Sequence, residues 1–210
     1  MYLHGFSDAS EMAYAACVYI KYVTKTGGIG VTFMTSKSRV VPVKKKFTIP
    51  RLELLGNVIL AKLMTSVRDA VYEELTVKNY LCWSDSMIAL SWIKSKKELG
   101  VFEENRVTEI KKNVSPDKWL HCRSEENPAD VITRFHLFDQ AKSDLYYNGP
   151  AFLKEINEDQ YVNTNNDVIN VDNVNDFNNV EVSYDNDERI TLSNVSEELA
   201  NLESVIDIKK

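Results

Sequence analysis

The sequence predicts an α/β domain built on one mixed five-stranded β-sheet, and three observations lead to this prediction. Three strand-like segments come first, joined by short connections that suit an antiparallel meander. A long segment with apolar residues at helical spacing follows. The remainder of the domain alternates strand-like with helix-like segments. This order favours two parallel strands beside the meander and helices on both faces of the sheet.

Each element is identified by its residue pattern. The meander strands are rich in β-branched and aromatic residues, and the glycines of 26–30 supply a turn. Pro50 suits the first turn of the long helix. In the last helix, Asn127 is the expected N-cap and Pro128 the first helical residue. The expected strands are 2–8, 13–23, 29–40, 79–85 and 118–124, and the expected helices are 49–75, 86–95, 103–114 and 127–134.

Charge is divided unevenly along the chain. Residues 1–154 hold 22 Lys and Arg against 17 Asp and Glu, a balance of +5, whereas 155–210 hold 3 against 14, a balance of −11. Residues 157–194 are rich in Asn and Asp and lack helical periodicity. We therefore expect a mildly basic domain over 1–156 and a largely disordered acidic tail over 157–210, with a short helix near 195–206.

The compartment is predicted from features that the sequence lacks. No apolar run approaches the roughly 18 residues of a membrane span, and the N-terminus has no secretory signal pattern. Cys17, Cys82 and Cys122 stand singly in strand-like segments, which is typical of buried free thiols in a reducing compartment. We expect an intracellular protein, cytoplasmic or nuclear, without a membrane partner.

Two aspartates stand at the ends of strand-like segments. Asp8 lies in GFSDASE (5–11), and Asp85 lies in CWSDSMI (82–88), directly after the long helix and the strand that follows it. Ligands of open α/β sheets gather at the carboxyl ends of the strands. If these two strands are parallel neighbours, the two carboxylates lie side by side, and a divalent cation would relieve their repulsion.

Two further acids suit the same edge. Glu53 lies in the first turns of the long helix, and Asp130 lies in the first turn of the last helix. Four such carboxylates can hold two Mg²⁺ or Mn²⁺ ions about 4 Å apart, an arrangement that activates water in phosphodiester hydrolysis. Each acid also has an ordinary structural explanation, as a turn residue, a capping residue or a solvated helix-start acid. Their order along the chain favours the joint site.

Six motifs occur together between residues 3 and 134 of this sequence. They are LHGFSDASEMAYAACVY (3–19), SKSRVVPVKK (36–45), TIPRLELLGNVILAKL (48–63), WSDSMIALSWI (83–93), NRVTEI (105–110) and WLHCRSEENPADVITR (119–134). Together they resemble the ribonuclease H domain of BEL/Pao-type retrotransposon polyproteins. The resemblance implies a ribonuclease H-like fold and cleavage of the RNA strand of RNA–DNA hybrids. It also implies catalytic and metal-ligand roles for Asp8, Glu53, Asp85 and Asp130.

The chain departs from that family in two respects. After Asp130 the family usually continues with small residues and Arg-Gly, whereas this chain has the segment VITRF (131–135). Such polyproteins also carry an aspartic protease, a reverse transcriptase and an integrase, and we find none of them in this sequence. We therefore expect an isolated fragment whose reverse transcriptase partner is encoded elsewhere.

Further residues are candidates for contact with an RNA–DNA hybrid, which proteins recognise by shape and phosphate contacts. Lys44, Lys45 and Lys46 precede the long helix and suit phosphate binding, although a solvated basic loop has the same composition. Ser10 and Ser86 suit either substrate contact or helix capping. His121 is a candidate for proton transfer, because cellular ribonucleases H often have a histidine before their last aspartate.

The sequence leaves more than one function open. The leading hypothesis is a metal-dependent ribonuclease H. The alternative is a catalytically silent nucleic-acid-binding or protein-interaction module of the same fold, from a decayed or co-opted element. An integrase or Holliday-junction resolvase of the same superfold has less support, because the sequence around Glu53 matches ribonuclease H.

Overall fold

The computed structural model describes residues 1–44, 46–71, 75–135 and 139–158. No helix in these ranges has the length and apolar character that a membrane span requires. The expected acidic tail lies outside the described residues from position 159 onward, and so does the helix expected near 195–206.

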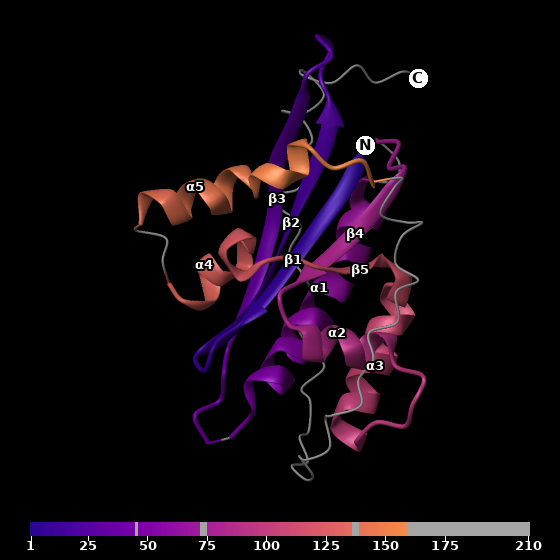
Figure 1. Ribbon diagram of the computed structural model, residues 1–210, viewed down its shortest axis with the longest axis vertical. Coiled ribbons are helices and arrows are strands. Elements are labelled where there is room, and N and C mark those ends of the chain that lie inside the picture. The colour runs from indigo at the N-terminus through magenta and orange to yellow at the C-terminus, as the bar shows by residue number, and fades with distance from the viewer. Residues whose placement is uncertain (45, 72–74, 136–138, 159–210) are drawn as a thin grey trace.

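One five-stranded sheet forms the centre of the domain, with the strand order β3-β2-β1-β4-β5 (Figure 1). β1 pairs antiparallel with β2, and β2 pairs antiparallel with β3. β4 pairs parallel with β1 and with β5. The predicted mixed sheet, with a three-stranded meander and two parallel strands, is confirmed. The strands are β1 (Tyr2–Ala9), β2 (Ala13–Val23), β3 (Ile29–Val40), β4 (Asn79–Ser84) and β5 (Trp119–His121).

Four of the α-helices lie where the sequence pattern predicts them. They are α1 (Ile49–Val71), α2 (Met87–Lys94), α3 (Val101–Asn113) and α4 (Ala129–Thr133), and a fifth, α5 (Gln140–Asn148), follows. The sequence did not predict α5, because it buries only Tyr146 and so has no apolar stripe. Its start is fixed instead by Asp139, whose side chain accepts hydrogen bonds from the Ala141 and Lys142 amides.

The last strand and α4 are shorter than expected. β5 ends at His121, although the Cys122 amide still donates to the Ser84 carbonyl at 3.2 Å. The chain then forms a 3-10 turn over Ser124–Glu126. This turn separates β5 from α4, so the predicted strand 118–124 and helix 127–134 each lose residues to it.

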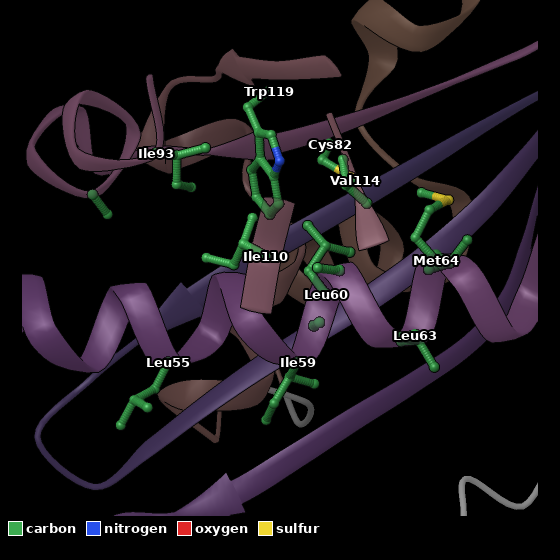
Figure 2. Close-up of a cluster of buried hydrophobic side chains, with 14 of the residues drawn as sticks. Leu55, Ile59, Leu60, Leu63, Met64, Cys82, Ile93, Ile110, Val114 and Trp119 are labelled. Atoms are coloured by element: carbon green, nitrogen blue, oxygen red, sulfur yellow. The ribbon is translucent and has the colours of Figure 1, made fainter. Parts of the chain in front are cut away.

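Two apolar layers cover the two faces of the sheet. Helices α1, α2 and α3 pack on one face, and Figure 2 shows Trp119, Cys82 and Ile110 gathered beside Leu60 of α1. On the other face, side chains of α4 and α5 join a second cluster that is rich in aromatic residues. Its members include Phe6, Tyr19, Trp83, Val131, Tyr146 and Leu153. The expected helices on both faces are confirmed, and Cys17, Cys82 and Cys122 are free and buried as predicted.

α1 comes unusually close to β1 at Gly56. A Cβ atom at this position would lie 3.0 Å from the carbonyl oxygen of Asp8 and 3.6 Å from that of Ala15. The absence of a side chain therefore lets the helix backbone approach the end of β1. Glu53, one helical turn earlier, is carried by this approach toward the carboxyl end of the strand.

A buried ion pair holds the first turn of α1 against α3. The Nε atom of Arg51 lies 2.7 Å from Oε1 of Glu103, and both side chains are more than nine-tenths buried. The guanidinium of Arg51 also lies over the Phe102 ring, 5.0 Å from its centroid. Charge-assisted hydrogen bonding and ring contact together fix the helix start that carries Glu53.

The opposite end of β1 binds the last described residues. Glu158 is buried, and its Oε1 atom lies 2.9 Å from Nζ of Lys21 and 3.1 Å from Nε2 of His4. The Lys21 ammonium also donates to the Ile156 carbonyl at 2.7 Å. The contacts of the domain therefore extend as far as Glu158.

Gly56→Ala tests the close approach of α1. Alanine is the better helix former by about 1 kcal/mol, but overpacking against the Asp8 carbonyl costs about 1–3 kcal/mol. We expect a net loss of about 1 kcal/mol in the free energy of unfolding, measured by urea titration. Asp69→Ala, an exposed position of the same helix, is the control and should not destabilise the domain. A Gly56→Ala protein as stable as the parent would contradict the close packing.

Candidate active site

The two predicted aspartates lie at the ends of neighbouring parallel strands. Ser7 of β1 is paired in register with Ser84 of β4, and each is followed by its aspartate, Asp8 or Asp85. Burial is the largest cause of the raised pKa of Asp8, and the negative charge of the neighbouring Asp85 raises it further. The prediction that the two strands are adjacent and parallel is confirmed.

Glu53 and Asp130 reach the same edge from two helices on opposite faces of the sheet. The charges of Asp85 and Asp8 both raise the pKa of Glu53. The charge of Asp130, on α4, raises the pKa of Asp8. The four acids are therefore linked by electrostatic interactions near the carboxyl ends of β1 and β4.

Asp8 is the most enclosed of the four. Its side chain is 3% exposed, and burial raises its pKa to about 7. A hydrogen bond from the Thr133 hydroxyl to Oδ2 acts in the opposite direction and lowers that pKa. Thr133 is held in turn by Ser10, whose hydroxyl donates to the Thr133 carbonyl at 2.9 Å. The end of α4 is thus tied to β1 on both sides of Asp8.

Glu53 has an unsatisfied oxygen. Its Oε2 atom is buried and has no hydrogen-bond partner among the described residues. Burial raises the pKa of Glu53 to about 7, and a hydrogen bond with Ser86 lowers it. One turn along α1, the buried Nδ2 of Asn57 also lacks a partner, while its Oδ1 accepts from the Ser7 hydroxyl at 2.6 Å. A buried acceptor without a donor is costly, so the position favours a cation or another ligand.

Asp85 is held by two residues that the sequence analysis did not assign to the site. The Ser124 hydroxyl donates to its Oδ2 at 2.6 Å, and Asn127 Nδ2 donates to its Oδ1 at 3.2 Å. Asn127 Nδ2 also donates to the Ser7 carbonyl, and Asn127 Oδ1 accepts from the Ala129 amide. The capping pattern predicted that last bond, but the contacts with β1 and Asp85 depend on tertiary structure.

Asp130 is already paired with cations. The Nε atom of Arg134 donates to its Oδ1, and Nζ of Lys142 lies 3.8 Å from its Oδ2. The pairing with Asp130 raises the pKa of Arg134. Asp130 therefore differs from Glu53, whose buried Oε2 has no hydrogen-bond partner within the ranges that the structure describes.

The donor chemistry of the site suits a divalent cation. Carboxylate oxygens are the ligands that Mg²⁺ and Mn²⁺ prefer, and the unpartnered Glu53 oxygen beside two other acids offers such a ligand. Within the described ranges, however, no three His, Cys, Asp or Glu side chains are arranged as a ready metal-binding group. Asp8, Glu53 and Asp85 therefore fit an ion by their chemistry, and their side chains would need to close around it.

The remaining predicted residues lie around this edge. Ser86 caps α2 by accepting from the Ala89 amide, and Ser10 caps the β1–β2 turn by accepting from the Met12 and Ala13 amides. His121 is exposed at the end of β5, in register with Ser84.

The predicted lysines lie in the connection between β3 and α1. Lys44 and Lys46 are exposed in this connection. Lys45 lies outside the described residues.

Comparison with known families gives a match over the first part of the chain. Residues 1–86 match the Pao retrotransposon-like RNaseH-like domain. The predicted resemblance is confirmed over these residues, which include Asp8, Glu53 and Asp85. The match ends before Asp130. A search of curated proteins gave no match.

Several solved structures that are similar to this chain are RNase H domains. The N-terminal RNase H domain of Rv2228c from Mycobacterium tuberculosis, a fusion with maltose-binding protein, has a TM-score of 0.45 and 14% identity, over 68% of this chain and 97% of that one. RNase H1 of Halobacterium salinarum NRC-1 has a TM-score of 0.38 and 12% identity, over 66% and 97% of the two chains. LC11-RNase H1 in complex with an RNA/DNA hybrid has a TM-score of 0.33 and 12% identity, over 60% and 87%.

The raised pKa of Asp8 predicts a pH-dependent effect of Asp8→Asn without divalent ions. A carboxyl group whose pKa is higher in the folded state stabilises the fold at low pH, and this contribution is lost as the pH rises through about 7. An asparagine side chain does not ionise. The free energy of unfolding of Asp8→Asn, relative to that of the parent, should therefore increase by on the order of 2 kcal/mol between pH 5 and pH 8. Urea unfolding in EDTA measures the difference, and Asp69→Asn is the control. If the variant and the parent differ in stability by the same amount at pH 5 and at pH 8, the raised pKa of Asp8 is wrong.

The end of α4 predicts a stabilising substitution. Phe135 has a φ of 57° and is 57% exposed. The left-handed region costs a residue with a Cβ atom about 1 kcal/mol, and little buried area would be lost. Phe135→Gly should therefore raise the free energy of unfolding by about 1 kcal/mol, whereas Phe135→Ala should not. Equal stability of the two variants in urea titration would contradict this conformation.

Proposed function

We propose that this chain is a metal-dependent ribonuclease H that cleaves the RNA strand of RNA–DNA hybrids. One observation carries the proposal: Asp8 and Asp85 stand side by side at the ends of parallel strands, with the unpartnered carboxylate oxygen of Glu53 in electrostatic contact with both. The match of residues 1–86 to a Pao-type RNase H-like domain supports the same substrate class.

The proposed roles follow from the surroundings of each acid. Asp8, Glu53 and Asp85 would hold the divalent ion, Mg²⁺ or Mn²⁺, and Asp130 would contribute to a second ion. Such ions, when bound, supply an activated water and stabilise the leaving oxygen. Ser124 and Asn127 orient Asp85 by donating to its two oxygens, and Thr133 orients Asp8.

Further residues would contact the substrate. Lys44 and Lys46 are exposed and positively charged, which suits contact with phosphates of the hybrid, and we extend this role to Lys45. His121, exposed beside Ser84 at the same edge of the sheet, suits transfer of a proton to or from the reacting groups. The hydroxyls of Ser10 and Ser86 are engaged in caps, so any substrate contact would use their remaining lone pairs or protons.

A second candidate function has support from the same geometry. In the described residues, Thr133 holds Asp8 and Arg134 holds Asp130, and the acids are not arranged as a ready metal-binding group. This favours a catalytically silent module that binds nucleic acid through the same surface. In either case we propose that the partner is an RNA–DNA hybrid, made by a reverse transcriptase encoded elsewhere.

Cleavage of a labelled RNA–DNA hybrid in Mn²⁺ and in Mg²⁺ separates the two functions. The parent protein should cut the RNA strand, and Asp85→Asn should lower the rate at least about a hundredfold, the order lost with one electrostatic stabiliser. Asp69→Asn removes an exposed carboxylate of α1 and should leave the rate unchanged. Hybrid binding without cleavage by the folded parent in either ion would favour the silent module.

A further inference from the structure

The four carboxylates of the site differ in the partners that they have in the structure. At one end, Glu53 Oε2 is buried and has no partner among the described residues. At the other end, Asp130 accepts from the Arg134 guanidinium through Oδ1 and faces the Lys142 ammonium through Oδ2 at 3.8 Å. Among the described residues, one end therefore has a buried carboxylate oxygen without a hydrogen-bond partner, and the other has a direct ion pair, although the Arg134 charge also lowers the pKa of Glu53 and of Asp8 from a greater distance.

The local structure holds Arg134 beside Asp130. It lies one helical turn after Asp130, so the ion pair forms within one short helix and its C-cap. The neighbouring residue Thr133 is fixed by Ser10 and by Asp8, which anchors the end of the helix at the site. The Arg134 side chain is 55% exposed, whereas that of Asp130 is 10% exposed, so the cation covers a nearly buried acid from the solvent side.

An ion that used Asp130 as a ligand would have to displace this guanidinium from Oδ1 or share the carboxylate with its positive charge. Displacement loses a charge-assisted hydrogen bond and brings the freed arginine charge close to the incoming cation. An ion held by Asp8, Glu53 and Asp85 would displace no direct ion pair of this kind within the described residues, where the hydrogen bonds to Asp85 come from the neutral donors Ser124 and Asn127.

We infer that Arg134 is the built-in counter-ion of Asp130, and that it makes the site bind its second divalent ion much more weakly than its first. This inference rests on the proposed function, because it assumes that the acids bind metal. It makes Arg134 a positioning residue that sets the number of ions held at a given concentration.

Calorimetric titration with Mn²⁺ tests the inference without relying on activity. The parent should bind one ion tightly and a second only weakly. Arg134→Gln keeps a hydrogen-bond donor but removes the charge, and it should tighten the second ion by about tenfold or more, which is about 1.4 kcal/mol. Arg134→Lys keeps the charge and should resemble the parent. The acidic tail is common to all variants, so differences between them report on the site.

Arg123→Gln is the matched control, because it removes the same charge from an exposed arginine paired with Glu125. This variant should bind both Mn²⁺ ions with the same affinities as the parent. If the parent binds two ions equally well and Arg134→Gln changes neither, the inference is wrong and the proposed function stands. If no binding is lost on Asp85→Asn, the site does not hold the ions, and the proposed function fails together with the inference.

Discussion

The parallel pairing of β1 with β4 determines where every other part of this domain lies. Residues of the two strands are in register from Tyr2 and Asn79 to Ser7 and Ser84, so the aspartates that follow must meet at one edge. Parallel pairing requires a long crossover, which α1 supplies. The same crossover brings Glu53 to the edge, and Gly56 lets the helix approach closely enough to do so.

This constraint also explains the electrostatic cost at the edge. Asp8 and Glu53 are both largely buried beside other carboxylates, and burial raises the pKa of each to about 7. The chain offsets part of this cost with its own groups, a hydroxyl at Asp8 and a guanidinium at Asp130. Glu53 has a hydrogen bond with Ser86, but its Oε2 atom has no partner in the described part of the chain, and an external cation there would satisfy a buried acceptor.

Much of the fold followed from sequence patterns, because the strands and α1 carry strong periodicity. The meander, the crossover and the neighbouring positions of Asp8 and Asp85 depend on local pattern and chain order, and all three were predicted. The pairing of Asp130 with Arg134 is also local, but only Asp130 was predicted as a site residue, and its partner Arg134 was not. Asn127 and Ser124 donate to Asp85 from 42 and 39 positions later in the sequence, and no local pattern encodes such contacts. α5 lacked an apolar stripe and was missed for that reason.

The most direct test of the central claim is where a paramagnetic ion binds. In nuclear magnetic resonance spectra, substoichiometric Mn²⁺ should broaden the amide signals nearest the carboxylates, those of Asp8, Asp85 and Asp130, first. The signals of His4 and Lys21, which lie at the other end of the sheet beside Glu158, should stay sharp at the same concentration. Broadening that begins in the acidic segment after residue 158, and leaves Asp8 and Asp85 sharp, would contradict a metal site at the ends of β1 and β4.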